Sequence, residues 1–313
     1  MNLTVACSPH IRGDFKTSRL MRDVVIALLP ALAVGIFQYG IRALIVVAVS
    51  IATALASEWL INVILRKRFT LHDCSAVITG LLLALSLPAS VPLWLVIIGC
   101  AFAIMVVKAL CGGQGQHVFN PALSGRALMM LIYPVGVTRY LSVDGVTGPT
   151  PMHEMAMGHL PEEGPMNLFL GNCPGSIGEL SAIALLAGGV YLVVRKVISP
   201  RIPLAYLGTV AVLTFVFAKG DNSFVWMLSQ MFSGGLFLGA IFFASDFATS
   251  PVTPNGQLIF GVGCGALTVL FRYFGLYPEG VTYAILLMNA CVWTIDRVTM
   301  PRRFGTGKGG SAR

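Results

Sequence analysis

The chain has 313 residues, of which 56% are hydrophobic and only 11% are charged, and its formal net charge is +8. A soluble domain of average composition carries about 25% charged residues, so this composition excludes an ordinary soluble protein. With a mean hydropathy of +0.81, the sequence predicts an all-α polytopic membrane protein, because most of its surface must face lipid.

Ten apolar stretches follow in chain order, each long enough or nearly long enough to cross about 30 Å of hydrocarbon as a helix. Five fall in a first membrane half, 24–137, and five in a second half, 177–296, while residues 138–176 connect the two. The predicted spans lie at 24–41, 43–65, 74–90, 91–110, 118–137, 177–194, 202–218, 222–245, 257–271 and 280–295.

Lys and Arg residues concentrate in the segments that share one side of this arrangement when the N-terminus lies inside. Cytoplasmic segments of membrane proteins carry such an excess. We therefore expect residues 1–23 and 297–313 to be cytoplasmic and the long loop 138–176 to be external. Residues 1–23 also lack the apolar core of a cleavable signal peptide. The net charge follows from this topology, and no nucleic-acid partner is needed to explain it.

A short stretch of the first half is similar in sequence to a stretch of the second half. "TGLLLALSLPASVP" (Thr79–Pro92) in the third span resembles "SGGLFLGAIFFASDFATSP" (Ser233–Pro251) in the eighth, since both have Gly near the start and end in small residues and Pro. Halves with an odd number of spans must run in opposite directions through the membrane. The predicted architecture is therefore two five-helix inverted repeats with one long external loop.

Isolated carboxylates accompany several predicted spans: Glu58 in the second, Asp73 before the third, Glu179 at the start of the sixth and Asp246 after the eighth. An ionisable residue in a membrane helix is a functional-site hypothesis by default. Glu58, Asp73 and Asp246 are our candidates for an ion pathway. Two alternatives remain open: Glu58 reaches back to the membrane interface, and Asp246 caps a helix or pairs with Arg126.

A glycine-rich stretch, "CGGQGQHVFNPALSGRALMM" (Cys111–Met130), leads into the fifth span. Asn120 and the proline after it are typical of a helix start, whose free N–H groups can hold an anion or a polar ring edge. Gly125 permits close approach of a backbone or a flat ligand, and Arg126 brings a charge into the span. The alternative is a re-entrant turn in which Arg126 pairs with Glu58 or Asp246.

The long loop contains "DGVTGPTPM" (Asp144–Met152), in which Thr147 and Thr150 stand among Gly and Pro residues. Such a composition is typical of a turn. A turn with two free hydroxyls is also a candidate modification site. The residues alone do not choose between these readings.

Taken together, "GGQGQHVFNPALSGRA", "DGVTGPTPM" and "SDFATSPVTPNG" resemble, in this order, the family of the Rnf electron-transport complex D subunit. The B subunit of the sodium-translocating NADH:quinone reductase shares the pattern. The resemblance covers nearly the whole chain. It favours the Rnf type, because the reductase type generally has a longer N-terminal extension than the 23 residues found here.

The resemblance implies a covalent flavin. In that family a threonine in a Ser-Gly-Ala-Thr context carries flavin mononucleotide (FMN) as a phosphate ester, attached by a separate transferase. The spacing assigns this role to Thr150, with Thr147 in place of the serine as a rival acceptor. Asp144, Gly145 and Gly148 belong to the same expected site. Pro149 replaces the usual alanine, which removes one backbone N–H beside the acceptor.

The reductase relative also holds a non-covalent riboflavin. The resemblance therefore suggests a riboflavin site here, and Asn120, Gly125 and Arg126 are our candidates for it. All three lie on the polar, glycine-flanked start of the fifth span.

For the whole chain, the resemblance implies a membrane subunit of an ion-translocating ferredoxin:NAD oxidoreductase in a bacterial or archaeal plasma membrane. Its expected partners are the A, B, C, E and G subunits, with ferredoxin and NAD reached through the complex and Na⁺ or H⁺ as the moved ion. No NAD-binding glycine motif and no Cys-x-x-Cys occur in this chain, so a metal site and a complete active site are not predicted. The alternatives are a quinone-reductase B-type subunit and a flavin-free channel or secondary transporter.

Overall fold

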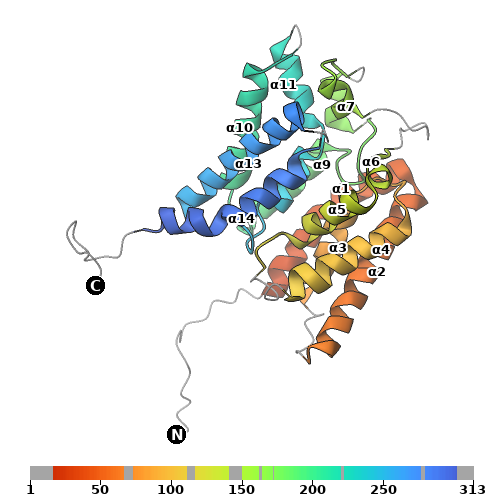
Figure 1. Ribbon diagram of the computed structural model, residues 1–313. Coiled ribbons are helices and arrows are strands. Elements are labelled where there is room, and N and C mark those ends of the chain that lie inside the picture. Colours follow the sequence, from red (N-terminus) through yellow and green to blue (C-terminus); the bar gives the residue numbers. More distant parts are fainter. Residues whose placement is uncertain are drawn as a thin grey trace, which may run out of the picture.

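The computed structural model describes residues 17–66, 73–110, 117–140, 150–161, 164–171, 173–219, 222–275 and 279–301. Over these ranges the chain is helical and contains no strand, which confirms the predicted all-α membrane fold. Figure 1 shows the first-half helices, orange to yellow, beside the second-half helices, cyan to blue.

The first half contains one helix for each predicted span. They are α1 (Thr17–Tyr39), α2 (Ile41–Ile64), α3 (Ser75–Leu85), α4 (Leu93–Phe102) with its π-helical continuation η2 (Ala103–Leu110), and α5 (Pro121–Ile132). A short helix, α6 (Pro134–Thr138), follows.

The connection between the halves carries two short helices, α7 (Pro151–Ala156) and α8 (Pro165–Leu170). The second half again has one helical segment for each predicted span. These are α9 (Ala182–Val194), α10 (Arg201–Val216), α11 (Ser223–Phe232) followed by α12 (Leu236–Leu238) and its π-helical continuation η3 (Gly239–Phe243), α13 (Pro254–Phe274) and α14 (Val281–Thr299).

Not all of these segments are long enough to cross a bilayer as one straight helix. Five are, namely α1, α2, α4 with η2, α13 and α14, and α11 with α12–η3 forms a sixth span that is bent by 61°. The apolar helices α3, α5, α9 and α10 have only 10–17 residues, fewer than the about 20 that a straight span needs. The protein therefore brings non-helical backbone to membrane depth, which is tolerated only inside protein or beside a cavity.

The same helix pairs pack together in both halves. In the first half α2 contacts α3 and α4, and α4 contacts α5; in the second half α10 contacts α11 and α13, and α13 contacts α14. Across the halves, the first helices α1 and α9 pack against each other, and so do the last helices α5 and α14. This is the contact pattern that two five-helix repeats predict.

The third elements of the two halves run in opposite directions. Helix α3 begins at Ser75, which lines the same pocket as Asp246. It ends at Leu85, whose carbonyl accepts a hydrogen bond from the Gly178 N–H at 2.8 Å. Segment α12–η3 instead begins beside Glu179, which follows Gly178 in the chain, and ends near Asp246. The antiparallel course agrees with the predicted inverted repeats.

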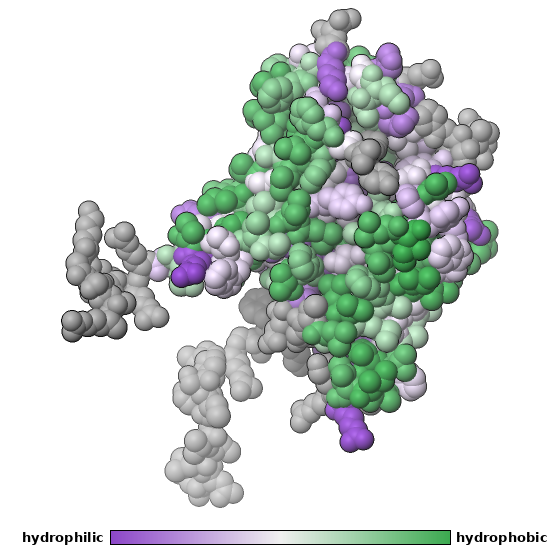
Figure 2. Space-filling view, in the orientation of Figure 1, coloured by the Kyte–Doolittle hydropathy of each residue, from purple (hydrophilic) through white to green (hydrophobic). Residues whose placement is uncertain are grey.

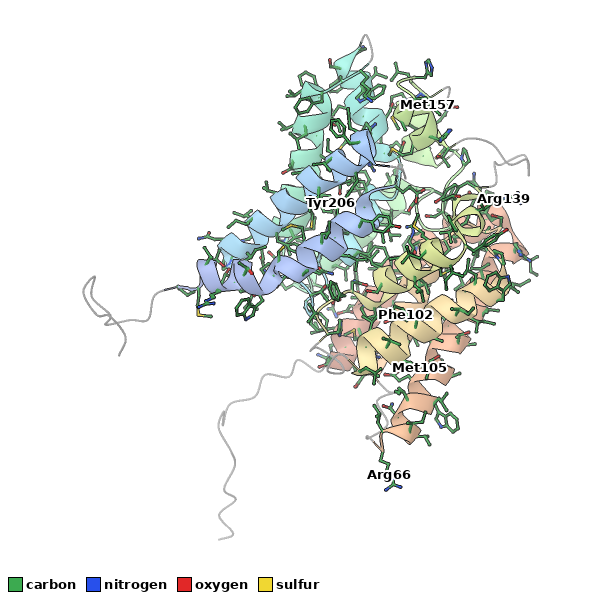
Figure 3. All side chains as sticks on the ribbon, viewed as in Figure 1. Arg66, Phe102, Met105, Arg139, Met157 and Tyr206 are labelled. Atoms are coloured by element: carbon green, nitrogen blue, oxygen red, sulfur yellow. The ribbon has the colours of Figure 1, made fainter. Side chains whose placement is uncertain are left out.

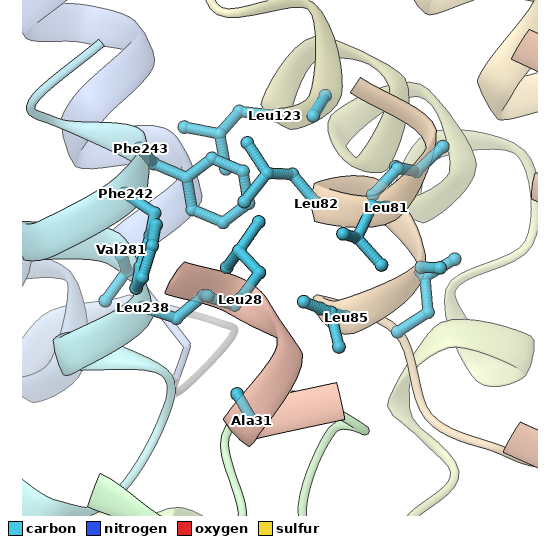
Figure 4. Close-up of a cluster of buried hydrophobic side chains, with 14 of the residues drawn as sticks. Leu28, Ala31, Leu81, Leu82, Leu85, Leu123, Leu238, Phe242, Phe243 and Val281 are labelled. Carbon is cyan, nitrogen blue, oxygen red and sulfur yellow. The ribbon is translucent and has the colours of Figure 1, made fainter. Parts of the chain in front are cut away.

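Apolar side chains fill the space where the halves meet. Figure 4 shows Leu28 and Leu85 of the first half facing Leu238, Phe242 and Phe243 of the second, all of them buried. Other large apolar side chains cover the outside, and Figure 2 shows them as a broad hydrophobic area across the middle of one face, with hydrophilic residues gathered at its ends. This surface is the one expected of a protein embedded in lipid.

Candidate functional site

Thr150 lies at the start of α7 and caps it. Its Oγ1 accepts a hydrogen bond from the His153 N–H at 3.2 Å, and Pro151 occupies the first helical position, where its missing N–H costs nothing. Among the described residues, no acceptor takes the proton of the Thr150 hydroxyl at hydrogen-bond distance. A half-buried hydroxyl of this kind fits the requirement of a phosphate ester for an accessible acceptor oxygen.

Helix α7 is fixed to the second half by a small cluster of its own. Met152 and Met155 are buried against Trp226 of α11, and the Trp226 indole N–H donates to the Tyr273 hydroxyl of α13 at 2.8 Å. Figure 3 shows α7, marked by Met157, close to α11 and at the opposite end of the molecule from Arg66. The cluster holds Thr150 against the bend between α11 and α12.

A pocket with an empty volume of about 340 Å³ opens beside Thr150. Its walls come from α7, from the segment before α9, from the α11–α12 bend and from Glu279, two residues before α14. The lining residues that carry the argument are Thr150, Glu179, Ser233, Gly234 and Glu279. Two carboxylates therefore share a pocket with the candidate flavin acceptor.

Two glycines make the bend between α11 and α12. Gly234 and Gly235 have φ values of 68° and 66°, a left-handed conformation that glycine adopts without a Cβ clash. A Cβ at Gly235 would also collide with Oε1 of Glu179. Behind the bend, Arg272 of α13 donates to the carbonyl of Gln230 at 2.6 Å and to that of Ser233 at 2.9 Å. The buried guanidinium thus satisfies carbonyls that the broken helix leaves free.

Arg126 of α5 joins the two carboxylates. Its Nη2 contacts Oε2 of Glu279 directly, and its Nη1 lies 3.8 Å from Oε1 of Glu179. The three side chains are between 6% and 14% exposed, so water screens them little. The suggested pairing of Arg126 with Glu58 or Asp246 is therefore wrong, and Glu279, which the sequence did not single out, is its main partner.

Tyr140 completes this cluster from the chain just after α6. Burial, together with the negative charge of nearby Glu279, raises the pKa of the Tyr140 phenol well above its ordinary value. The hydroxyl therefore keeps its proton and remains a hydrogen-bond donor.

Glu58 belongs to a different buried network. Nζ of Lys108 in η2 donates to Oε1 of Glu58 at 2.7 Å and to Oγ of Ser75 at 2.7 Å. Glu58 thus points into the subunit, whereas Arg66, eight residues later, points away from it (Figure 3). The alternative in which Glu58 reaches back to the membrane interface is wrong.

A larger pocket, with an empty volume of about 800 Å³, lies by Lys108 and the start of α5. Its polar lining includes Ser75, Lys108, His117, Asn120 and Asp246. Nε2 of His117 is 3.7 Å from Oδ2 of Asp246.

Asp246 stabilises the turn that follows η3. Its Oδ1 accepts a hydrogen bond from the Ala248 N–H at 3.3 Å. This contact with a backbone N–H resembles the predicted cap and does not involve Arg126. Asp73 lies two residues before α3 and is half-buried.

The three candidates for a riboflavin site do not meet in one pocket. Asn120 caps α5 by accepting from the Ala122 N–H at 3.1 Å, and it lines the larger pocket. Gly125 packs against α4, where an added Cβ would lie 2.7 Å from the carbonyl oxygen of Gly99. Arg126 instead lines a small pocket that shares Glu179 and Glu279 with the one beside Thr150. Close helix packing therefore explains Gly125, and only Asn120 borders the larger pocket.

Four residues of the expected FMN site, Asp144, Gly145, Thr147 and Gly148, lie outside the described residues. The same holds for residues 111–116, which carry the glycines of the motif before α5. In the described part of the chain, no group of three or more His, Cys, Asp or Glu side chains is arranged to hold a metal ion.

Comparison with known proteins places this arrangement in a family. Residues 4–305 match the model of the NQR2, RnfD, RnfE family. The D subunit of a Na(+)-translocating ferredoxin:NAD(+) oxidoreductase complex from Acetobacterium woodii is 44% identical, over 98% of this chain and 97% of its own. The D subunit of a proton-translocating ferredoxin:NAD(+) oxidoreductase complex from Clostridium ljungdahlii is 42% identical, over 97% of this chain and 96% of its own. The D subunit of an ion-translocating oxidoreductase complex from Shewanella amazonensis is 36% identical, over 97% of this chain and 99% of its own. The chain therefore belongs to the NQR2, RnfD, RnfE family.

Proposed function

We propose that this chain is the D subunit of an ion-translocating ferredoxin:NAD oxidoreductase complex and that it carries FMN as a phosphate ester on Thr150. Three relatives of nearly the same length are named as D subunits of such complexes or of an ion-translocating oxidoreductase complex. Within this chain, the observation that carries the proposal is the Thr150 hydroxyl at the start of α7. It lies at the mouth of a pocket, and no acceptor among the described residues takes its proton.

The chain's own residues would position the flavin rather than perform the redox chemistry. The flavin, when bound, supplies one-electron and two-electron transfer. Trp226, Met152 and Met155 fix the attachment point through α7. Glu179 and Glu279, which pair with Arg126, set the charge of the adjoining pocket. We propose that electrons pass through this site between the sister A, B, C, E and G subunits of the complex.

We also propose that both termini lie in the cytoplasm and that α7 faces the outside. The predicted excess of Lys and Arg supports the orientation, and the structure supports the polarity, since Arg66 and α7 lie at opposite ends (Figure 3). One relative is named as Na(+)-translocating and another as proton-translocating, so we propose that the ion moved here is Na⁺ or H⁺. Glu58, Asp73 and Asp246 remain our candidates for its path.

A non-covalent riboflavin is a separate proposal, and the larger pocket beside Asn120 is the place for it. That pocket combines apolar walls with a few polar side chains, including His117, Asn120 and Asp246, which is the usual lining of a small-molecule site. Purified protein whose denatured supernatant contains no free flavin would rule out this second cofactor.

The covalent cofactor is tested by denaturing gels viewed under ultraviolet light. Wild-type protein from a host with an active flavin transferase should fluoresce after full denaturation, and Thr150→Val should not. Thr147→Val is the matched control, since it removes the neighbouring hydroxyl and should leave the fluorescence intact. Fluorescence that persists in Thr150→Val and disappears in Thr147→Val would move the attachment point to Thr147. A dark wild-type band would refute the proposal.

A further inference from the structure

We propose that Glu179 binds a proton when an electron reaches the flavin on Thr150, so that the buried site keeps its charge. This inference rests on the proposed function and adds a role for a residue that the attachment itself does not use. It starts from the pocket, in which Thr150 and Glu179 line the same walls.

The two carboxylates stand between two cavities. Glu179 and Glu279 line the pocket that opens at Thr150, and they also line a smaller one bounded by Leu123, Arg126 and Phe243. A negative charge added to a flavin ring at the mouth of the first pocket would act on this pair across its partly enclosed space. Because the pair is buried, the interaction is stronger than it would be in water.

The charges around the pair leave Glu179 the less compensated carboxylate. Arg126 contacts Glu279 directly but lies 3.8 Å from Glu179. Arg272, a second buried cation close to the pair, uses its guanidinium for the carbonyls of Gln230 and Ser233. Among the described residues, the other titratable groups that face the pair are Tyr39, Tyr140 and Cys173, which are neutral when protonated. Glu179 is the second buried carboxylate beside a single guanidinium. Of the two carboxylates, it is therefore the one whose charge is relieved most by binding a proton.

Two buried hydroxyls lie where they can hydrogen-bond to the glutamates in either the ionised or the protonated state. Tyr140 is 4% exposed and Ser176 is 0% exposed, and they face Glu279 and Glu179. Neither hydroxyl oxygen makes a hydrogen bond of normal geometry to the described residues. A serine hydroxyl can donate to a carboxylate and can accept from a carboxylic acid. Ser176 therefore offers Glu179 a partner before and after it binds the proton.

The step is balanced in charge and atoms. One electron, supplied by reduced ferredoxin through the complex, adds to the flavin. One proton from water forms an O–H bond on the Glu179 carboxylate, and it leaves again when the flavin passes its electron on. No other bond forms or breaks, and the net charge of the pocket stays constant through the cycle.

The test is a redox titration of the flavin in the intact purified complex, followed optically at a series of pH values with the electrode as reductant. In wild type, proton uptake with one electron lowers the midpoint potential by about 59 mV per pH unit over the range in which Glu179 is ionised beside oxidised flavin and protonated beside reduced flavin. Glu179→Gln should flatten this dependence over that range. Glu154→Gln, which removes a carboxylate on α7 that does not line the pocket, should keep the wild-type dependence.

Infrared difference spectra between oxidised and reduced complex give a second readout. Wild type should gain the carbonyl stretch of a protonated carboxylic acid on reduction, and Glu179→Gln should not gain it. If Glu179→Gln fails to assemble, Glu279→Gln provides the second variant, because it frees Arg126 to pair with Glu179 and should also suppress the band.

The outcomes separate the two proposals. A wild-type complex without covalent flavin overturns the proposed function and this inference together. A flavin on Thr150 whose potential and infrared band are unchanged in Glu179→Gln overturns the inference alone. If Glu154→Gln loses the pH dependence and the infrared band to the same extent, the inference is also overturned. The effect would then come from removing any nearby negative charge and not from Glu179 itself.

Discussion

Replacing Arg126 with Met tests the ion cluster directly. The substitution keeps most of the side-chain volume but leaves Glu179 and Glu279 buried without their cation. The exposed fractions of these side chains lie between 6% and 14%, so solvent cannot replace the guanidinium. Removing one partner of a buried ion pair costs about 3–5 kcal/mol of stability.

This loss is large enough to measure by thermal unfolding in detergent. At roughly 2 °C per kcal/mol for a chain of this size, the apparent Tm of Arg126→Met should fall by roughly 6–10 °C. The double variant Arg126→Met/Glu279→Gln should recover part of the loss, because one stranded negative charge is gone. A Tm within about 2 °C of wild type for the single variant, or no recovery in the double variant, would refute the cluster as described.

Three further results are expected. Trp226→Ala should release α7 from α11, so amide exchange in α7 should become faster while exchange in α13 stays slow, as measured by hydrogen–deuterium mass spectrometry. Gly125→Val should force α5 away from Gly99 and reduce the yield of folded protein, whereas Gly208→Val, at a helical glycine with open space around it, should not; equal yields would argue against the close packing. Lys108→Met should destabilise more than the double variant Lys108→Met/Glu58→Gln, because the single change strands the Glu58 carboxylate; the opposite order of Tm values would contradict that pairing.

Hydropathy was sufficient to predict where the helices lie but not how far each one extends. The run at 74–90 reads as one apolar span, yet α3 ends at Leu85, and Pro88 and Pro92 follow in non-helical backbone. The run at 222–245 is likewise apolar throughout, but Gly234 and Gly235 bend it by 61°. A window average responds to total apolarity, whereas these breaks depend on backbone conformation at single residues.

The partners of buried charges could not be predicted from spacing. Arg126 and Glu279 are 153 residues apart, and Glu279 reads locally as an ordinary Pro-Glu-Gly turn. Lys108 lies near the end of the predicted span 91–110, where η2 continues to Leu110 and places its side chain inside the protein. The available signal was the general rule that charges at membrane depth are paired, which says that a partner exists but not which one.

Thr150, in contrast, is assigned by the resemblance to the family motif, and the structure adds the pocket beside it. The proposed electron-relay role therefore depends most on whether this hydroxyl carries the flavin.

Peptide mass spectrometry of the protein purified from its native host tests that claim most directly. We predict that the Asp144–Met152 segment carries the mass of FMN, less one water, on Thr150 and that Thr150→Val loses it. An unmodified segment from a host with an active flavin transferase would contradict the proposed function and favour a flavin-free transporter.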